Sequence, residues 1–280
     1  MARRYRGVVM GRRQGPQLTQ ASQGEHAAMP GPESITWRCG PPLDGSAPRT
    51  LADLIADRVQ RFADRTVLVD TDGRSWSWRD LDAAGARLAG SWQPRLQPGD
   101  RVALLLPNGA AHLVCELACW RLGLLPAPVY RHQPSERLAR ALALVAPALV
   151  VHEPGMVMPG DRATFPASAV LEASSPPAAW RAADEDAPCL LLQTSGSGGV
   201  PRAVTLTQRN VCSQQAAFAQ LWPEVGPEDR LVGYLPWHHS FGSLADRLWA
   251  LGRGCTVHLA PQEGRDHAGL ADSVRRVRPK

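Results

Sequence analysis

Residues 190–210 read LLLQTSGSGGVPRAVTLTQRN, and this stretch decides the fold. The apolar run at residues 189–192 has the length of a buried strand. Residues 203–207 (AVTLT) favour a second strand because they include β-branched side chains. Between the two runs, residues 194–199 are all glycine, serine or threonine. The stretch therefore predicts a strand, a glycine-rich loop and a second strand.

A loop of this composition suits phosphate binding. Glycines lack a Cβ and tolerate positive φ, so their backbone N–H groups can turn toward an anion. Hydroxyl groups add hydrogen-bond donors, and Arg202 adds a fixed charge whose planar fork matches phosphate oxygens. Glycines alone are equally compatible with a hairpin loop that binds nothing. A Walker A loop and a dinucleotide fingerprint are both disfavoured, because Pro201 and the run after it indicate a strand where those motifs need a helix.

The loop resembles the signature of the adenylate-forming superfamily, which includes acyl-CoA synthetases, luciferases and peptide-synthetase adenylation domains. That signature runs Thr-Ser-Gly-(Ser/Thr)-Thr-Gly-x-Pro-Lys-Gly. The matching residues are Thr194, Ser195, Gly196, Ser197, Gly199 and Pro201. Three positions depart from it: Gly198 replaces a hydroxyl residue, Arg202 replaces lysine, and Ala203 replaces glycine. The arginine fits a chain whose lysine is Lys280 alone, whereas Gly198 removes a hydroxyl from the phosphate cradle.

A second motif lies at residues 235–242, LPWHHSFG, and is similar to the family motif Leu-Pro-x-x-His-x-x-Gly. By this resemblance, His239 and Gly242 lie at the acyl substrate and its adenylate. Within this motif, the sequence HHSFG resembles that of long-chain or aromatic acyl-CoA synthetases. Adjacent residues on an extended segment face opposite ways, and no third ligand is evident, so His238 and His239 do not predict a metal site. The segments GDRV, LPN and WRLGLLPAP (99–102, 106–108, 120–128) are similar to earlier family segments in the same order.

Hydrophobic periodicity predicts an α/β fold in which helices cover parallel sheets. Helices are predicted at 51–62, 80–92, 109–122, 134–145, 208–222, 244–251 and 269–277, and strands at 66–70, 75–78, 101–106, 126–130, 148–152, 169–171, 189–192, 203–207, 230–234 and 255–259. The resemblance implies the αβαβα layers of the large N-terminal domain, incomplete at the C-terminus. We expect a disordered basic tail at 1–35, a first α/β subdomain at 36–183, and at 184–280 the start of a second one that holds the phosphate loop.

Composition limits the function classes. The chain has 280 residues, of which 44% are hydrophobic and 20% charged, as in globular proteins. The net charge of +5 comes from five arginines within the first thirteen residues, so the body predicts no nucleic-acid partner. No apolar run reaches the length of a membrane span. The six cysteines follow no metal or disulfide framework, which favours a reducing cytoplasm, with an Arg-rich organelle-targeting tail as the alternative.

The resemblance also implies a reaction and its cofactors. A carboxylate attacks the α-phosphate of ATP, and a thiol, usually that of coenzyme A, then takes the acyl group from the adenylate. The residues implied to hold the phosphates are Thr194, Ser195, Gly196, Ser197, Gly198, Gly199 and Arg202. Mg²⁺ would bridge phosphate oxygens and keep several waters. The family's catalytic lysine lies in a C-terminal lid domain, and Lys280 does not match it, so no catalytic residue is assigned in this chain.

Family members continue beyond the point that residue 280 matches. We therefore expect this sequence to be part of a longer enzyme, or to need a separate chain that supplies the C-terminal half, and to be inactive alone. Two alternatives stay open: a non-catalytic remnant that binds a nucleotide or a partner, and a ligase that loads a carrier protein instead of coenzyme A. The sequence does not indicate which small carboxylic acid is activated.

Overall fold

The computed structural model describes residues 47–195 and 201–280, in which helices and strands alternate along the chain. Sheet B has the spatial order β4-β3-β5-β6, and each neighbouring pair of strands is parallel. Its strands are β3 (Arg101–Leu105), β4 (Leu125–Pro128), β5 (Leu149–His152) and β6 (Thr164–Pro166). A parallel sheet of this kind needs helical crossovers between its strands, as the alternating sequence pattern predicts.

Strand β3 is buried on both of its faces. Val102 and Leu104 belong to the larger hydrophobic core, whereas Ala103 and Leu105 belong to a smaller one. Successive side chains of a strand point to opposite faces, so one strand can contribute to both cores. This double burial explains why the segment after Arg101 is continuously apolar instead of alternating.

Sheet A joins segments that lie far apart in the sequence. Its strands are β1 (Thr66–Val69), β2 (Ser75–Ser77), β9 (Arg230–Gly233) and β10 (Thr256–Leu259), in the order β2-β1-β10-β9. β1 and β2 form the predicted antiparallel hairpin, while β10 pairs in parallel with both β1 and β9. Leu68 lies opposite Val257, so this sheet takes strands from both sides of the boundary expected between residues 183 and 184. That boundary stays a prediction.

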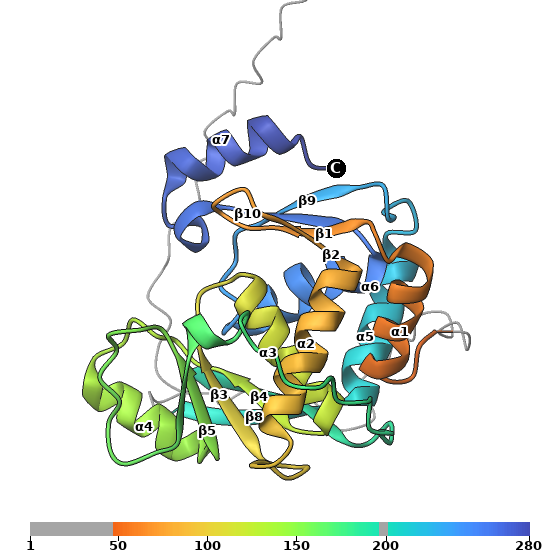
Figure 1. Cartoon of the computed structure of the whole chain (residues 1–280). Helices are drawn as coiled ribbons and strands as arrows, with labels where there is room; N and C mark the ends of the chain where they lie inside the picture. Colours follow the sequence, from red (N-terminus) through yellow and green to blue (C-terminus); the bar gives the residue numbers. More distant parts are fainter. Residues whose placement is uncertain (1–46, 196–200) are drawn as a thin grey trace, which may run out of the picture. The chain divides into compact units, whose positions relative to one another are not determined.

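The helices fill layers around the two sheets (Figure 1). They are α1 (Leu51–Phe62), α2 (Trp78–Trp92), α3 (Ala110–Leu122), α4 (Ser135–Val145), α5 (Gln208–Leu221), α6 (Trp249–Arg253) and α7 (His267–Val277). Figure 1 shows α2, α3, α5 and α6 between sheet A and sheet B, with α7 on the outer side of sheet A and α4 on the outer side of sheet B. The larger core occupies the middle layer, and the smaller core lies under α4. Among the described helices, none has the length and hydropathy that a bilayer span requires.

Helix starts follow local capping chemistry. The Thr50 hydroxyl accepts the N–H of Asp53, and the Asp53 carboxylate accepts the N–H of Thr50, which forms a capping box at the start of α1. Thr207 and Asn210 form the same arrangement at α5. Both helix starts are predicted correctly from the sequence, because the cap and its partner are only three residues apart.

Helix α3 begins differently, because its N-cap residue, Gly109, has no side chain. Asp70, just after β1, supplies the missing acceptor: its Oδ1 accepts the N–H of Ala110 at 3.2 Å. Its other oxygen accepts the indole N–H of Trp76 at 2.9 Å. A carboxylate at a helix N-terminus also interacts favourably with the helix dipole, so Asp70 joins β1, β2 and α3.

Two predicted elements are wrong in position. The strand expected at 169–171 is β6, at Thr164–Pro166, and residues Ala167–Ala169 form the 3₁₀ turn η2. β6 pairs with the edge of β5 and stops at Pro166, which lacks the N–H needed to continue a ladder. The helix expected at 244–251 begins earlier, as the π-helix η3 (Gly242–Leu248), and continues through α6.

Candidate functional site

The predicted phosphate loop lies at the tip of a β-hairpin. Strands β7 (Pro188–Ser195) and β8 (Pro201–Thr207) pair in an antiparallel register that places Thr194 opposite Arg202. This pair departs from the parallel arrangement expected for the sheets. Both side chains are exposed, so a hydroxyl and a guanidinium flank the loop. The loop residues Gly196, Ser197, Gly198 and Gly199 lie outside the described residues, as does the side chain of Ser195.

The body of the hairpin is fixed to the layers beneath it. Leu190 and Leu192 lie in the larger core and Leu191 in the smaller one, so β7 is buried on both faces. β7 also lies beside β4 of sheet B. Near the tip, the Gln193 side chain donates from Nε2 to the carbonyl of Ala141 in α4 at 2.9 Å. The exposed tip therefore projects from a well-packed base, which suits a binding loop.

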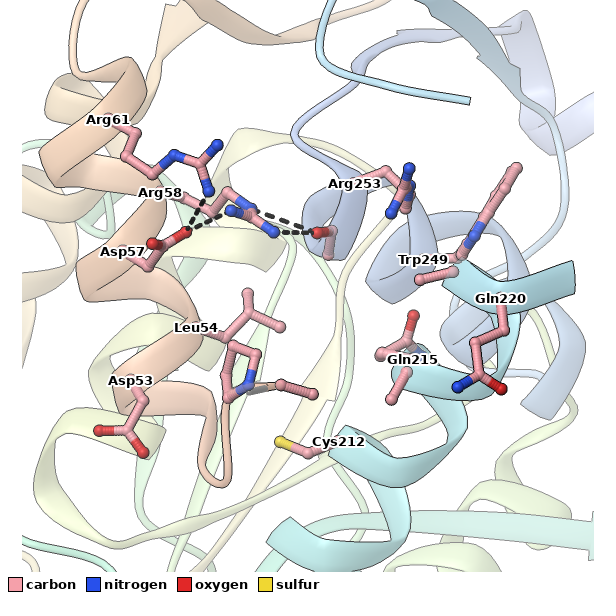
Figure 2. Close-up of a pocket in the computed structure, with 15 residues that line it drawn as sticks. Asp53, Leu54, Asp57, Arg58, Arg61, Cys212, Gln215, Gln220, Trp249 and Arg253 are labelled. Atoms are coloured by element: carbon pink, nitrogen blue, oxygen red, sulfur yellow. Dashed lines mark hydrogen bonds and ion pairs between the residues drawn. The ribbon is translucent and has the colours of Figure 1, made fainter. Parts of the chain in front are cut away.

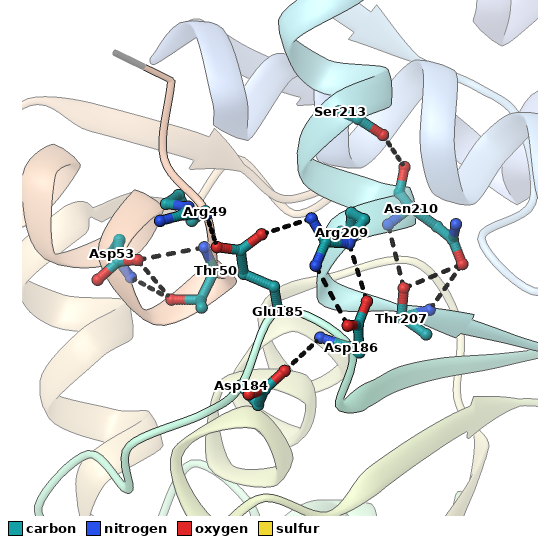
Figure 3. A network of polar contacts seen from close by, with 10 residues as sticks. All are labelled: Arg49, Thr50, Asp53, Asp184, Glu185, Asp186, Thr207, Arg209, Asn210 and Ser213. Atoms are coloured by element: carbon teal, nitrogen blue, oxygen red, sulfur yellow. Dashed lines mark hydrogen bonds and ion pairs between the residues drawn. The ribbon is translucent and has the colours of Figure 1, made fainter. Parts of the chain in front are cut away.

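A polar network closes the other end of the hairpin (Figure 3). Arg209, after β8, pairs with Glu185 and Asp186, which precede β7, at 2.8 Å each. Glu185 also pairs with Arg49 at the start of α1. The Leu51 N–H donates to the buried Gln208 side chain at 2.9 Å. These contacts join the hairpin, α1 and α5, so the base of the phosphate loop is held by three parts of the chain.

His239 lies on a short loop between β9 and η3. Its N–H donates to the carbonyl of Pro236 at 3.0 Å, and its carbonyl accepts the N–H of Ser243 at 2.8 Å. The backbone of His239 is thus held at both ends while its side chain is exposed. An imidazole presented in this way can contact a ligand directly.

Gly242 is required by the packing of this loop. A Cβ at position 242 would lie 2.2 Å from the carbonyl oxygen of Pro236, far inside normal contact distance. Gly242 is buried, and η3 begins there. The glycine of the family motif therefore has a structural reason in this chain: it lets η3 start directly against the backbone of residue 236.

Asn108 and Asp246 hold the segment before His239. The Asn108 side chain donates from Nδ2 to the carbonyl of Leu235 at 2.8 Å and accepts the N–H of Trp237 at 2.9 Å. Asp246 accepts the N–H of Leu235 at 3.4 Å, and burial raises the pKa of Asp246 to about 7. Neither residue was predicted to act on the His239 loop. Asn108 belongs to the segment LPN, which is similar to a family segment, but the residues that it contacts, Leu235 and Trp237, lie more than 120 positions away.

His238 and His239 face different surroundings. The ring of His238 packs against that of Tyr130, with 4.9 Å between centroids, and burial lowers the pKa of His238 to about 4. His238 is therefore neutral at physiological pH, and it packs against Tyr130 while His239 is open to solvent. Tyr130 follows β4, which lies beside β7, so β4 connects the His239 loop to the phosphate hairpin.

A charged contact lies beside the same loop. Arg131 donates to Glu263 at 2.7 Å and pairs with Glu153 at 2.9 Å. Glu263 is buried and has a φ of +53°, a conformation that is uncommon for residues other than glycine. Its carboxylate also accepts the N–H of Asn108 at 3.4 Å. Glu263 therefore connects Arg131, after β4, to Asn108, which supports the His239 loop. The sequence did not predict this contact because the three residues are far apart along the chain.

A cavity of about 580 Å³ lies between α1, α5 and α6 (Figure 2). The arginines that line it are engaged within the fold: Arg58 with Asp57 and the carbonyl of Gly252, and Arg253 with the carbonyl of Val225. Arg61 also pairs with Asp57, at 3.6 Å. Of the residues predicted for ATP or acyl binding, those that the structure describes (Thr194, Arg202, His239 and Gly242) do not line this cavity. We therefore assign the candidate site to the hairpin tip and the His239 loop.

The donor set at the hairpin tip fits an anion. Thr194 offers a hydroxyl, and Arg202 offers a guanidinium that matches phosphate oxygens in a fork. Over residues 47–195 and 201–280, no three His, Cys, Asp or Glu side chains are grouped as metal ligands.

The layered α/β fold, the hairpin with its glycine-rich tip and the histidine loop together place the chain with the N-terminal domains of the adenylate-forming superfamily. The sequence profile described as "AMP-binding enzyme" matches residues 55–280. The chain belongs to the AMP-binding enzyme family.

Among curated proteins, the mitochondrial malonate–CoA ligase ACSF3 of Xenopus laevis is 27% identical over 244 residues, covering 78% of this chain and 41% of that protein. The sulfoacetate–CoA ligase of Cupriavidus necator is 29% identical over 256 residues, covering 81% and 48%. The chain thus spans less than half the length of these relatives.

Solved structures share the fold. The N-terminal subdomain of Klebsiella oxytoca NpsA, in complex with 3-hydroxyanthranilyl-AMSN, superposes with a TM-score of 0.73 at 22% identity, covering 82% of this chain and 59% of that one. ATP-bound MatB from Rhodopseudomonas palustris gives a TM-score of 0.69 at 21% identity, covering 80% and 47%. At these identities the likeness concerns the fold alone.

Proposed function

We propose that this chain carries the ATP-binding and acid-binding part of a ligase that activates a carboxylic acid. One observation carries the proposal: Thr194 and Arg202 lie opposite each other at the exposed tip of a hairpin whose base is fixed, in a chain of the AMP-binding family. The ATP-bound relative MatB supports nucleotide binding by this fold. The proposed reaction is attack of a carboxylate oxygen on the α-phosphorus of ATP, with pyrophosphate as the leaving group.

The residues take distinct roles in this proposal. Arg202 and Thr194, with the loop between them, bind the β- and γ-phosphates and hold the leaving pyrophosphate. The loop residues proposed for this cradle are Ser195, Gly196, Ser197, Gly198 and Gly199. His239 lies beside the acyl group, and Gly242 sets its position. The work of these groups is orientation and charge stabilisation, since the nucleophile and the leaving group both belong to the substrates.

The acid is proposed to be largely apolar. Aromatic side chains are exposed in and beside the His239 loop, namely Tyr130, Tyr234 and Phe241, and Phe241 is 67% exposed. A relative from Mycobacterium tuberculosis, 25% identical, is named a medium/long-chain-fatty-acid–CoA ligase. Other relatives are named for malonate and sulfoacetate, which are short and charged. The aromatic surroundings favour a fatty or aromatic acid over those two.

Coenzyme A is the proposed thiol acceptor, because several relatives are named CoA ligases. A carrier protein is the second candidate, since a peptide-synthetase adenylation protein shares the fold. An assay with pantetheine-bearing acceptors of both kinds distinguishes them. The cytoplasm is the proposed location, on the cysteine content of the sequence.

The proposal is tested first by ATP binding, measured by calorimetry on the 280-residue chain. Arg202→Gln removes a charge-assisted contact and should weaken ATP binding about tenfold or more. Arg276→Gln, at an exposed arginine of α7, is the matched control and should bind ATP like the parent. Equal affinity in the Arg202 variant and the parent would remove the phosphate role of the hairpin.

Activity is then measured as acid-dependent exchange of pyrophosphate into ATP, with octanoate, benzoate and malonate as test acids. Exchange with octanoate or benzoate supports the proposed substrate class, whereas exchange with malonate alone contradicts it. ATP binding without exchange by the chain, alone or combined with the C-terminal half of a relative, supports the non-catalytic alternative.

A further inference from the structure

A fully buried ion pair lies directly behind the His239 loop. Arg247 of η3 pairs with Glu116 of α3, and the two side chains are 1% and 0% exposed. A second arm of the Arg247 guanidinium donates from Nη2 to the hydroxyl of Ser243 at 2.5 Å. His112, one turn before Glu116, lies 3.6 Å from its carboxylate. Burial holds the pKa of His112 well below its usual value, so this histidine adds no charge to the pair.

Overall stability is a poor explanation for these charges. Removing two charges from water is costly, and replacing a buried ion pair by apolar side chains of similar size is often neutral or stabilising. A buried ion pair can instead serve to specify one local conformation, which apolar packing alone would define less well. Burial lowers the pKa of Arg247 to about 9, so the guanidinium remains charged at neutral pH.

The geometry that this pair can define is that of η3. A π-helix is rare and is found mostly as a short segment near functional sites, so this turn needs contacts that favour it over an α-helix. Arg247 provides them, because it joins Ser243 at the start of η3 to Glu116 on a separate helix. The N–H of Ser243 in turn holds the carbonyl of His239 at 2.8 Å.

The cluster formed by Glu116, Arg247, Ser243 and His112 also packs against the N-terminal end of the His239 loop. The Trp237 ring is 1% exposed and contacts both Arg247 and His112. The guanidinium of Arg247 is 5.4 Å from the Trp237 ring centroid, and the His112 ring meets it edge-on at 5.3 Å. The segment from Trp237 to Ser243 is therefore packed against the cluster at both ends, with His239 in the middle.

We propose that Glu116 and Arg247 are positioning residues that set the place of His239 through η3. The ion pair stabilises the π-helical conformation at the start of η3, and this conformation fixes the position of the Ser243 N–H. The Ser243 N–H in turn fixes the His239 carbonyl, so that the imidazole lies at the acyl site. The significance of His239 for the acid rests on the function proposed above, whereas the mechanical link between the pair and the loop does not.

The link is tested by hydrogen exchange on the Glu116→Leu/Arg247→Met double variant, which removes both charges and keeps the volume. Its melting temperature should stay within about 3 °C of the parent, because both partners leave together. Amide exchange at His239 and Ser243 should rise about tenfold, since η3 loses its anchor. The matched control is Asp82→Leu/Arg121→Met, which removes an ion pair between α2 and α3. Exchange at residues 234–248 that matches this control would overturn the proposal.

A second variant decides the question if the double variant does not fold. Arg247→Lys keeps the charge for Glu116 but cannot reach Ser243 and Glu116 with two arms. Raised exchange confined to residues 234–248 supports the proposal, and exchange equal to that of the parent overturns it.

Kinetic constants distinguish a specific effect on the position of His239 from a general loss of structural order. In pyrophosphate exchange, the Glu116→Leu/Arg247→Met variant should raise KM for the acid about tenfold and leave KM for ATP within about twofold, because the ATP contacts lie on the hairpin. Equal increases in both constants, or none, would overturn the positioning role. If the parent, combined with the C-terminal half of a relative, shows no exchange with any acid, the proposed function fails while the hydrogen-exchange result still decides the link between the pair and the loop.

Discussion

Replacing Gly242 with alanine should destabilise the chain and displace His239. The added Cβ would lie 2.2 Å from the carbonyl oxygen of Pro236 and 2.8 Å from its carbon. Real Cβ atoms essentially never approach other heavy atoms closer than 3.0 Å, so the backbone must move by at least 0.8 Å. The obstacle is backbone and not the end of a flexible side chain, so no rotamer change can relieve it.

The expected cost is about 3 kcal/mol of unfolding free energy, at the upper end of what overpacking produces. The displaced carbonyl is also the acceptor for the His239 N–H at 3.0 Å, so the imidazole moves with it. Under the proposed function, Gly242→Ala should raise KM for the acid more than KM for ATP. Urea unfolding measures the first effect and pyrophosphate exchange the second.

Gly226→Ala is the matched control. Gly226 lies in a loop, a Cβ there meets nothing within 4 Å, and its φ is not positive. Its replacement should be neutral or stabilise by about 0.5 kcal/mol, through the unfolded chain. If Gly242→Ala unfolds at the same urea concentration as Gly226→Ala, the close approach of η3 to Pro236 is refuted.

Substitutions at three further positions test other contacts of the fold. Burial raises the pKa of Asp246 from 3.8 to about 7, so its stabilising contribution is full below pH 3.8 and is lost as the pH rises through about 7. Asp246→Asn should therefore match the parent at pH 4 and exceed it by up to about 4 kcal/mol at pH 8 in urea unfolding; an equal difference at both pH values would contradict the raised pKa. Asp70→Ala should cost about 2 kcal/mol, because the N–H groups of Ala110 and Trp76 lose their acceptor, while Asp70→Asn should cost less; equal losses would contradict this. Thr207→Ala should cost about 1 kcal/mol through loss of the α5 cap, and an unchanged midpoint of thermal unfolding would show that the cap is not needed.

The features predicted correctly from sequence are those whose cause is local. The caps at Thr50 and Thr207 are recognisable because cap and partner are three residues apart. Strands β7 and β8 follow from their apolar and β-branched runs, whereas their antiparallel pairing departs from the parallel sheets that were expected. The strand near residue 169 was misplaced because its actual position depends on the open edge of β5, which no local pattern reveals.

The support of the candidate site depends on distant partners and could not be predicted. Asn108 reaches Leu235 and Trp237 across 127 and 129 positions. Glu116 was expected to be one helical residue among others, and only the fold brings it to Arg247. Gly242 begins η3 directly against the backbone of Pro236, a contact that no local pattern reveals, whereas the apolar spacing of residues 244–251 is compatible with an ordinary α-helix.

The strand order of sheet A affects how the chain can fold during its synthesis on the ribosome. Leu68 pairs with Val257, 189 positions later, and β10 lies between β1 and β9. At the usual speed of a ribosome, about 10 to 40 s separate the synthesis of these two strands. Throughout that time the β1–β2 hairpin has emerged without its central neighbour, and its edge is open to other chains. Efficient production of this protein should therefore depend on protection of the nascent hairpin, for example by a chaperone, until β10 leaves the ribosome.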